Sequence, residues 1–264
     1  MKQRSLFEIT LLLAVSFYCT SFITEEKEIK VDKYVAKIIS GRVSKTITSG
    51  EYSGKSSIYF QYFKLDDKSP KYLKTVNELI SKTVNSDFEE TEKQKITANL
   101  SKKYFEDILV TFKKSFYDAG AIFPWSIMDS IRIDNSKSQF THLETYTYSY
   151  TGGAHGNGFE SHFLIDKVSG EKLTISSVFN NLKKLNSLVD AYFRKSNHLS
   201  ASDNLQDAGW FIDNQLKATN NFFFRDKKVV FVYNTYEIAP YSMGVTQVKI
   251  PLSRLENILK IKLI

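Results

Sequence analysis

Residues 139–166 constrain the fold of this chain more than any other stretch. Tyr146, Tyr148 and Tyr150 alternate with threonine and serine, and a side-chain pattern with a period of two is typical of a β-strand. Four glycines follow within residues 152–158, before a second extended segment. Glycine accepts the backbone angles that a tight turn requires. We therefore expect two antiparallel strands joined by a glycine-dependent hairpin.

The other segments fall into runs of strand-like and helix-like pattern. Strand-like segments, bounded by turn residues, cover residues 28–65, 126–134, 159–166, 221–224, 229–233 and 245–250. Apolar residues recur at helical spacing over residues 73–84, 96–116, 182–193, 205–216 and 252–259. Because the two kinds of segment are segregated along the chain, the sequence predicts an α+β fold of mostly antiparallel sheets with packed helices.

A change of pattern near residues 120–126 suggests two consecutive subdomains. We expect an N-terminal α+β domain over residues 25–122 and a C-terminal domain over residues 123–264. The chain has 264 residues, of which 42% are hydrophobic and 14% aromatic. This is enough apolar material for a core in each subdomain.

The N-terminus has the layout of an export signal. Lys2 and Arg4 precede an apolar run over residues 9–18, which is too short to span a bilayer stably. We assign residues 1–24 to a signal peptide and tether, with Cys19 as the candidate for lipid attachment. Cleavage after Ser21 is an alternative, and so is a buried N-terminal strand or helix with a chance cysteine. The predicted location is exported, either periplasmic or membrane-anchored by a lipid.

Composition excludes several classes of site. A single cysteine rules out an internal disulfide and any cysteine-built metal cluster. The four histidines form no ligand motif, although His142 and His162 could face one another across a strand pair. The net charge of +7 is spread over isolated lysine doublets without a basic arm. We therefore predict no metal, no cofactor and no nucleic-acid partner.

Two segments are candidates for recognition. The glycine-rich residues 150–158 could present main-chain N–H groups to an anion, or form only a tight hairpin in which His155 holds the backbone. The second is the irregular loop at residues 234–244, where Tyr236 and Tyr241 offer large amphipathic side chains. Tyrosines on a stiff loop suit recognition and suit equally the covering of a core.

These segments occur in the order of a known domain family. Residues 150–156 are followed by a strand, Val168-Ser169-Gly170, a helix near Leu182, Asn221-Phe222 and residues 236–244. In this order they resemble the extracytoplasmic domain of RsiV-type (lysozyme-sensing) anti-sigma factors. Some exported polysaccharide deacetylases and many uncharacterised envelope lipoproteins carry a similar domain. The resemblance covers residues 126–259, and residues 28–120 more loosely resemble the domain that usually precedes it.

The resemblance implies a binding domain. In the anti-sigma factors the domain is similar to a receptor for lysozyme, whose glycan cleft its loops occupy. Neither their cytoplasmic sigma-binding segment nor the metal-binding domain of the deacetylases has a counterpart in this sequence. We therefore expect an exported, envelope-associated, non-enzymatic protein that recognises a lysozyme-like protein or a cell-wall glycan. The positive net charge argues against simple electrostatic capture of a strongly basic lysozyme.

The candidate ligand-binding residues come from the two segments. They are Tyr150, Gly152, Gly153, His155, Gly156, Tyr236, Glu237, Pro240, Tyr241 and Gly244. Two other functions stay open. One is a wall-directed hydrolase in which His155 acts as base with Glu237 or Asp166 as the acid. The other is a structural partner of an envelope complex.

Overall fold

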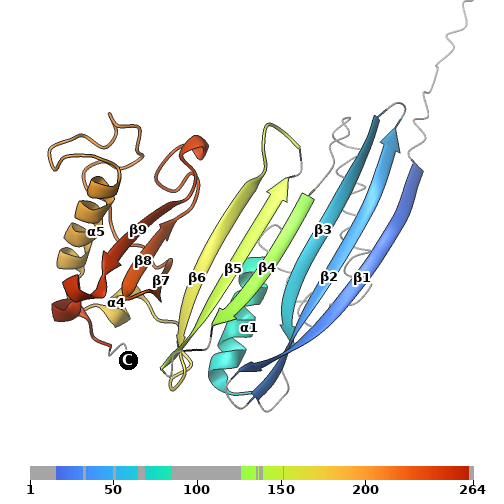
Figure 1. Cartoon of the computed structure of the whole chain (residues 1–264), viewed down its shortest axis with the longest axis horizontal. Coiled ribbons are helices and arrows are strands. Elements are labelled where there is room, and N and C mark those ends of the chain that lie inside the picture. The colour runs from blue at the N-terminus through green and yellow to red at the C-terminus, as the bar shows by residue number, and fades with distance from the viewer. Residues whose placement is uncertain are drawn as a thin grey trace, which may run out of the picture.

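The fold is dominated by one long sheet (Figure 1). The computed structural model describes residues 16–31, 34–49, 52–64, 69–84, 126–134, 136, 139–150 and 152–261. The sheet has six strands in chain order, which are β1 (Ser16–Val31), β2 (Tyr34–Ser49), β3 (Tyr52–Lys64), β4 (Ser126–Asp134), β5 (Phe140–Tyr150) and β6 (Asn157–Asp166). All neighbours are antiparallel except β3 and β4, which pair in parallel. The sheet therefore continues across the expected subdomain boundary at residues 122–123.

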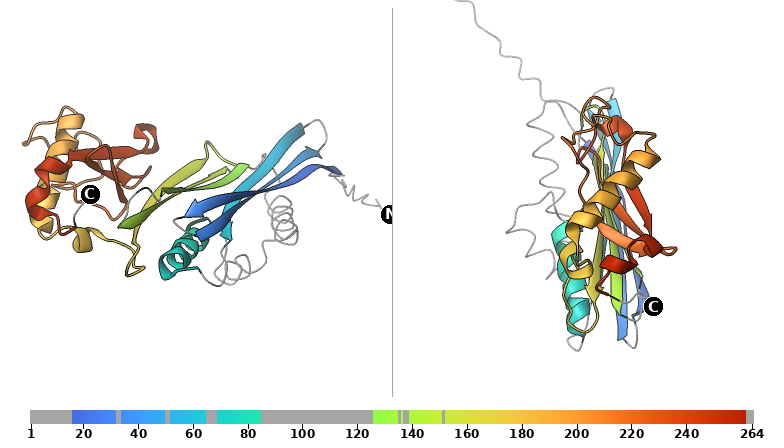
Figure 2. Two further views of the ribbon diagram at one scale, coloured as in Figure 1. Left: turned by 60° about the horizontal axis from the view of Figure 1, so that its bottom comes forward. Right: turned by 90° about the vertical axis from the view of Figure 1, so that its left-hand side faces the viewer.

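Helix α1 (Lys71–Val84) covers one face of this sheet, as Figure 2 shows. Tyr72, Leu73, Val76 and Ile80 recur at helical spacing and are buried. They pack against side chains that alternate inward from three strands, namely Ile131, Leu143 and Ile165. The opposite face of β5 and β6 carries the side chains of His142, Glu144, Glu160 and His162, which are described below.

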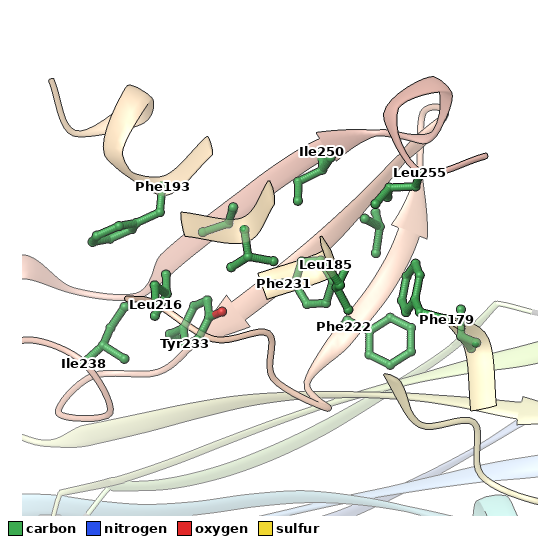
Figure 3. Packing of buried hydrophobic residues seen from close by; sticks show 14 of the residues in the cluster. Phe179, Leu185, Phe193, Leu216, Phe222, Phe231, Tyr233, Ile238, Ile250 and Leu255 are labelled. Atoms are coloured by element: carbon green, nitrogen blue, oxygen red, sulfur yellow. The ribbon is translucent and has the colours of Figure 1, made fainter. Parts of the chain in front are cut away.

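A second layer lies beside β6, at the end of the long sheet opposite β1 (Figure 1). Its sheet is formed by β7 (Phe222–Arg225), β8 (Lys228–Tyr233) and β9 (Thr246–Pro251). Its helices are α4 (Ile175–Val178), α5 (Leu182–Ser196) and the single turns η1 (Tyr241–Met243), η2 (Leu252–Arg254) and η3 (Glu256–Ile258). Figure 3 shows the core between them, in which the fully buried Phe179, Phe222 and Phe231 meet.

Two asparagine side chains join the second layer to the edge of β6. Asn234 accepts a hydrogen bond from the main-chain N–H of Glu160 at 2.8 Å and donates to its carbonyl at 3.1 Å. Asn221 donates to the same carbonyl at 2.8 Å and accepts from the N–H of His162 at 2.7 Å. The amides thus bond to main-chain groups that a further strand would otherwise pair.

The predicted α+β fold of mostly antiparallel sheets with packed helices is confirmed. The tyrosine alternation forms β5, and the following strand is β6. Residues 16–24, which we assigned to the signal and tether, lie in β1 and pair with β2. The predicted helix at residues 96–116 lies outside the described residues. No helix in the described part of the chain has the length and apolar character needed to cross a membrane.

The prediction of a helix at residues 205–216 is wrong, because local hydrogen bonds turn the chain there. The side chain of Asn204 accepts from the main-chain N–H of Gln206 at 2.9 Å, and Gly209 adopts a positive φ of 87°. The buried guanidinium of Arg194 then binds the carbonyls of neighbouring residues, which are Ser200, Asp203 and Asn214. These bonds replace those of a helix.

Candidate functional site

Three of the predicted residues meet at one end of the second layer. The imidazole of His155 stacks on the ring of Tyr241, with ring centroids 3.7 Å apart and an interplanar angle of 13°. Tyr236 lies beside both, with its centroid 6.4 Å from His155 and 5.8 Å from Tyr241. Its hydroxyl is 3.3 Å from Nε2 of His155. Tyr236 and Tyr241 follow His155 by 81 and 86 positions in the sequence, and the fold brings all three into one cluster.

The loop that carries Tyr236 and Tyr241 is held by its own polar groups. The carboxylate of Glu237 accepts hydrogen bonds from the main-chain N–H of Asn234 at 3.0 Å and from its side-chain amide at 3.3 Å. Pro240 begins the single turn η1, and Gly244 ends it at a φ of 67°. Glu237, Pro240 and Gly244 therefore shape the loop, and Tyr236 and Tyr241 form its surface.

The glycine-rich segment also divides into supporting and surface residues. The hydroxyl of Tyr150 donates to the carbonyl of Gly153 at 3.1 Å, and Gly152 and Gly153 both have positive φ. Gly156 is buried under the phenol of Tyr148, which a side chain at this position would meet. Within this segment only the imidazole of His155 joins the ring cluster.

The sequence analysis missed neighbouring side chains that enlarge this surface. Phe211 is 58% exposed and Met243 is 43% exposed, high fractions for large apolar side chains. The N–H of Phe211 donates to the carbonyl of Ile238 at 2.8 Å, which fixes the two loops to one another. The pattern of residues 205–216 gives no signal for Phe211, because its helical spacing predicts an amphipathic helix instead of an exposed loop. We call His155, Phe211, Tyr236, Tyr241 and Met243 the loop surface.

A shallow hollow adjoins the loop surface. It has a volume of about 550 Å³ and is lined by Trp210, Phe211, Pro240, Gln206 and Asp213. Aromatic and proline surface lies there beside an amide and a carboxylate. Such a combination of apolar walls and a few polar groups is the ordinary lining of a ligand site.

A second cluster lies buried beneath the β7–β8 hairpin. Nε2 of His142 is 3.0 Å from Nδ1 of His162, and Nε2 of His162 is 2.5 Å from a carboxylate oxygen of Glu160. Phe223 packs on both imidazoles, with centroids 5.3 Å from His142 and 4.1 Å from His162. We call His142, His162 and Glu160 the histidine relay. The expected meeting of His142 and His162 across the strand pair is thus observed.

Burial controls the charges in the histidine relay. The pKa of His142 is lowered to about 3. The main cause is desolvation by burial, and the second is the charge of the neighbouring His162. The hydrogen bond from His162 lowers the pKa of Glu160. Near neutral pH the relay therefore holds a neutral His142 and an ionised Glu160. On the same sheet face, burial raises the pKa of Tyr146, and Tyr148 and Tyr241 raise it further.

The contacts around His155 do not include the carboxylates of the hydrolase hypothesis. Nδ1 of His155 lies 3.0 Å from the carbonyl of Gly156, and its other described partners are the two tyrosines. Glu237 is bonded to Asn234, and Asp166 accepts from main-chain N–H groups of the following turn. Within the described residues, no three His, Cys, Asp or Glu side chains are grouped to hold a metal ion.

Comparison with known proteins identifies relatives of the fold but no activity. A DUF3298 family member from Bacteroides fragilis NCTC 9343 is similar in structure, with a TM-score of 0.59 and 19% identity over 94% of this chain and 95% of the other. A DUF3298 family protein from Pseudomonas aeruginosa PAO1 has a TM-score of 0.52 and 18% identity over 94% of each chain. No curated protein matches the chain. Residues 174–253 match the model of the DUF3298 family, which is described as a protein of unknown function.

Proposed function

We propose that this protein is an exported, envelope-associated, non-enzymatic binding protein that recognises a protein ligand through the loop surface. The observation that carries the proposal is the stack of His155 on Tyr241 beside the half-exposed Tyr236. Large aromatic side chains and methionine are enriched at protein interfaces. Their exposure on adjoining loops is otherwise unfavourable in water, and clustered exposed apolar groups mark interaction sites.

The rigidity of the loop surface supports the same function. Tyr236 has a positive φ of 67°, which is uncommon for a residue with a side chain. Its position is maintained by the ring contacts and by the hydrogen bonds of Glu237. A surface that is ordered before binding loses less conformational entropy when the ligand arrives.

Export and lipid attachment belong to the same proposal. Their support is the basic start, the short apolar run and the position of Cys19 after it. Figure 1 shows that β1 begins at the far end of the long sheet from the second layer. A lipid on Cys19 would therefore leave the loop surface directed away from the membrane.

A cell-wall glycan is the second candidate ligand. The hollow beside the exposed ring of Phe211 favours it, because pyranose rings pack on flat aromatic groups while Gln206 and Asp213 can bind hydroxyls. A glycan ligand would require the hollow, whereas a protein ligand would require Tyr236 and Tyr241. The two candidates can therefore be separated by mutation.

The experiment measures binding of immobilised protein to c-type lysozyme and to soluble peptidoglycan fragments. We expect Tyr236→Ala and Tyr241→Ala to weaken lysozyme binding about tenfold or more, the effect of removing an interface anchor. Val168→Ser is the matched control, because Val168 is 94% exposed on a turn at the other end of β6. Absence of lysozyme binding by the wild-type protein, or equal loss in the Val168 variant, would refute the protein-ligand proposal. Fragment binding abolished by Phe211→Ser would instead support the glycan.

Lipid attachment is tested separately in cells. Palmitate labelling of the full chain should be lost in Cys19→Ser, and the variant should be released from the membrane fraction. Labelling that persists in this variant, or a wild-type protein retained in the cytoplasm, would contradict export with a lipid anchor at this cysteine.

A further inference from the structure

A small hollow with charged walls opens where the β7–β8 hairpin turn meets the face of the long sheet. Its volume is about 170 Å³. The charged and polar lining residues come from three strands and the β7–β8 turn and are Arg132, Asp134, His142, Glu144, Arg225 and Asp226. The hollow is large enough to admit a small molecule. The hollow is distinct from the loop surface in all of its residues.

One wall presents two guanidinium groups to the hollow. Arg132 and Arg225 lie 3.9 Å and 3.7 Å from the same buried oxygen of Glu144. These distances are too long for hydrogen bonds, and this oxygen has no hydrogen-bond partner among the described residues. Arg225 also lies 4.7 Å above the ring of Phe223, which orients its guanidinium. Charge and stacking therefore hold the two groups while N–H donors remain for a ligand carboxylate.

The neighbouring pair along β4 and β5, Asp134 and His142, offers acceptors instead of donors. Ionised Glu160 accepts a hydrogen bond from Nε2 of His162, and Nε2 of the neutral His142 donates to Nδ1 of the same imidazole. His142 is then neutral with Nδ1 as its acceptor atom. Asp134 pairs with His142 across β4 and β5 and carries a negative charge at the same end of the hollow. An imidazole acceptor beside a carboxylate suits an ammonium group.

We propose that this hollow binds a small zwitterion of the amino-acid class, with its carboxylate at Arg132 and Arg225 and its ammonium group at His142 and Asp134. Three carboxylates and two guanidiniums line the hollow, so a simple anion such as phosphate would meet a net repulsion. A simple cation would be repelled by the two guanidiniums of Arg132 and Arg225. A zwitterion satisfies the two guanidiniums and the neighbouring acceptors at once, and the spacing of these groups along β4 and β5 selects its length.

The test uses calorimetric titration of the full chain with glycine, β-alanine and 4-aminobutyrate. At least one of them should bind, and its N-acetyl and amide derivatives, which each lack one charge, should bind at least about tenfold more weakly. Arg225→Gln and Arg132→Gln should each weaken binding of the zwitterion by a similar factor. Two variants are used so that the test remains decisive if one of them fails to fold. Lys227→Gln is the matched control, because Lys227 lies in the same turn but does not line the hollow.

Three results would overturn the proposal. They are the absence of heat with all three zwitterions at millimolar concentration, equal binding of the N-acetyl derivative, and equal loss in the Lys227 variant. Equal binding of the N-acetyl derivative would indicate a general anion site. Because no residue of the loop surface lines the hollow, failure of the lysozyme experiment would not by itself refute this proposal.

Discussion

Acid should destabilise this protein through His142. The pKa of His142 is about 3 in the folded protein and close to its ordinary value of 6.5 in the unfolded chain. Between these values the unfolded chain binds the proton that the folded protein excludes. The free energy of unfolding must therefore fall as the pH decreases from 6.5 towards 3. At pH 4.5, two pH units below the unfolded pKa, the loss from this group is about 3 kcal/mol at 1.36 kcal/mol per unit.

Other charges around His142 do not reverse this direction. His162, Arg225 and Arg132 also lower its pKa, and only Asp134 raises it. Glu160 has a lowered pKa, so its stabilisation is present above its unfolded value near 4.5 and is lost only below that pH. The interval from pH 7.5 to pH 4.5 therefore reports mainly on the imidazole of His142.

Urea unfolding at pH 7.5 and pH 4.5 measures the effect. The matched variant is His142→Gln, because the amide nitrogen of glutamine can donate to His162 but does not titrate. Between pH 7.5 and pH 4.5, the free energy of unfolding of the wild-type protein should fall by about 3 kcal/mol more than that of this variant. Equal losses in the two proteins would refute the assignment of a low pKa to His142 and, with it, the neutral state used for the histidine relay.

Three substitutions test the packing that supports the sites, and each is measured by urea unfolding. Asn234→Ala leaves the main-chain N–H of Glu160 without its partner and should cost about 2–3 kcal/mol. Arg194→Met leaves one carboxylate oxygen of the largely buried Asp190 and three carbonyls without their donor and should cost about 3–5 kcal/mol. Gly156→Ala places a methyl group against Tyr148 and should cost about 1–3 kcal/mol.

Each substitution has a control in the chain. Lys195→Met changes an exposed neighbour of Arg194, and Asn180→Ala changes an exposed asparagine, so neither should alter stability by more than about 0.5 kcal/mol. Adding Tyr148→Ala should relieve the clash in Gly156→Ala. Stability losses in these controls as large as those in the test variants would contradict the packing argument.

The sequence predicted best where one local pattern decides the structure. In a strand, the alternating Tyr146, Tyr148 and Tyr150 must all lie on the same face of the sheet. The structure has this strand as β5. Helix α1 likewise follows its apolar spacing. Residues 205–216 show the opposite case, because the side chain of Asn204 binds the N–H of Gln206, Arg194 binds the carbonyl of Asn214, and these bonds override the helical spacing.

The candidate site was predictable only in its individual loops. The glycine-rich segment and the tyrosine loop were recognisable, but the stack of His155 on Tyr241 depends on how the second layer packs on β6. The same holds for the histidine relay. Its two imidazoles could be paired from the strand pattern, whereas the covering ring of Phe223 comes from a strand about sixty residues later. Long-range packing of this kind has no local signature.

Glu160 connects the two sites. Its carboxylate ends the histidine relay, and its main-chain N–H and carbonyl are bound by Asn234, which also holds the loop of Tyr236 through Glu237. A substitution at Asn234 should therefore alter both the histidine relay and the loop surface, because both depend on the position of Glu160 in β6. Coupling through such a shared element is reciprocal for binding.

This coupling can be measured in a single variant. In Asn234→Asp the oxygen acceptor for Glu160 is kept, but the donor to its carbonyl is lost and a charge is placed beside Glu237. We expect the pKa of His142, followed by imidazole NMR, to rise towards 6.5, and the loop surface to bind its ligand more weakly. A variant in which binding falls while the His142 pKa stays near 3 would show that the loop and the relay respond separately. The link through Glu160 would then be wrong, although each site could persist without it.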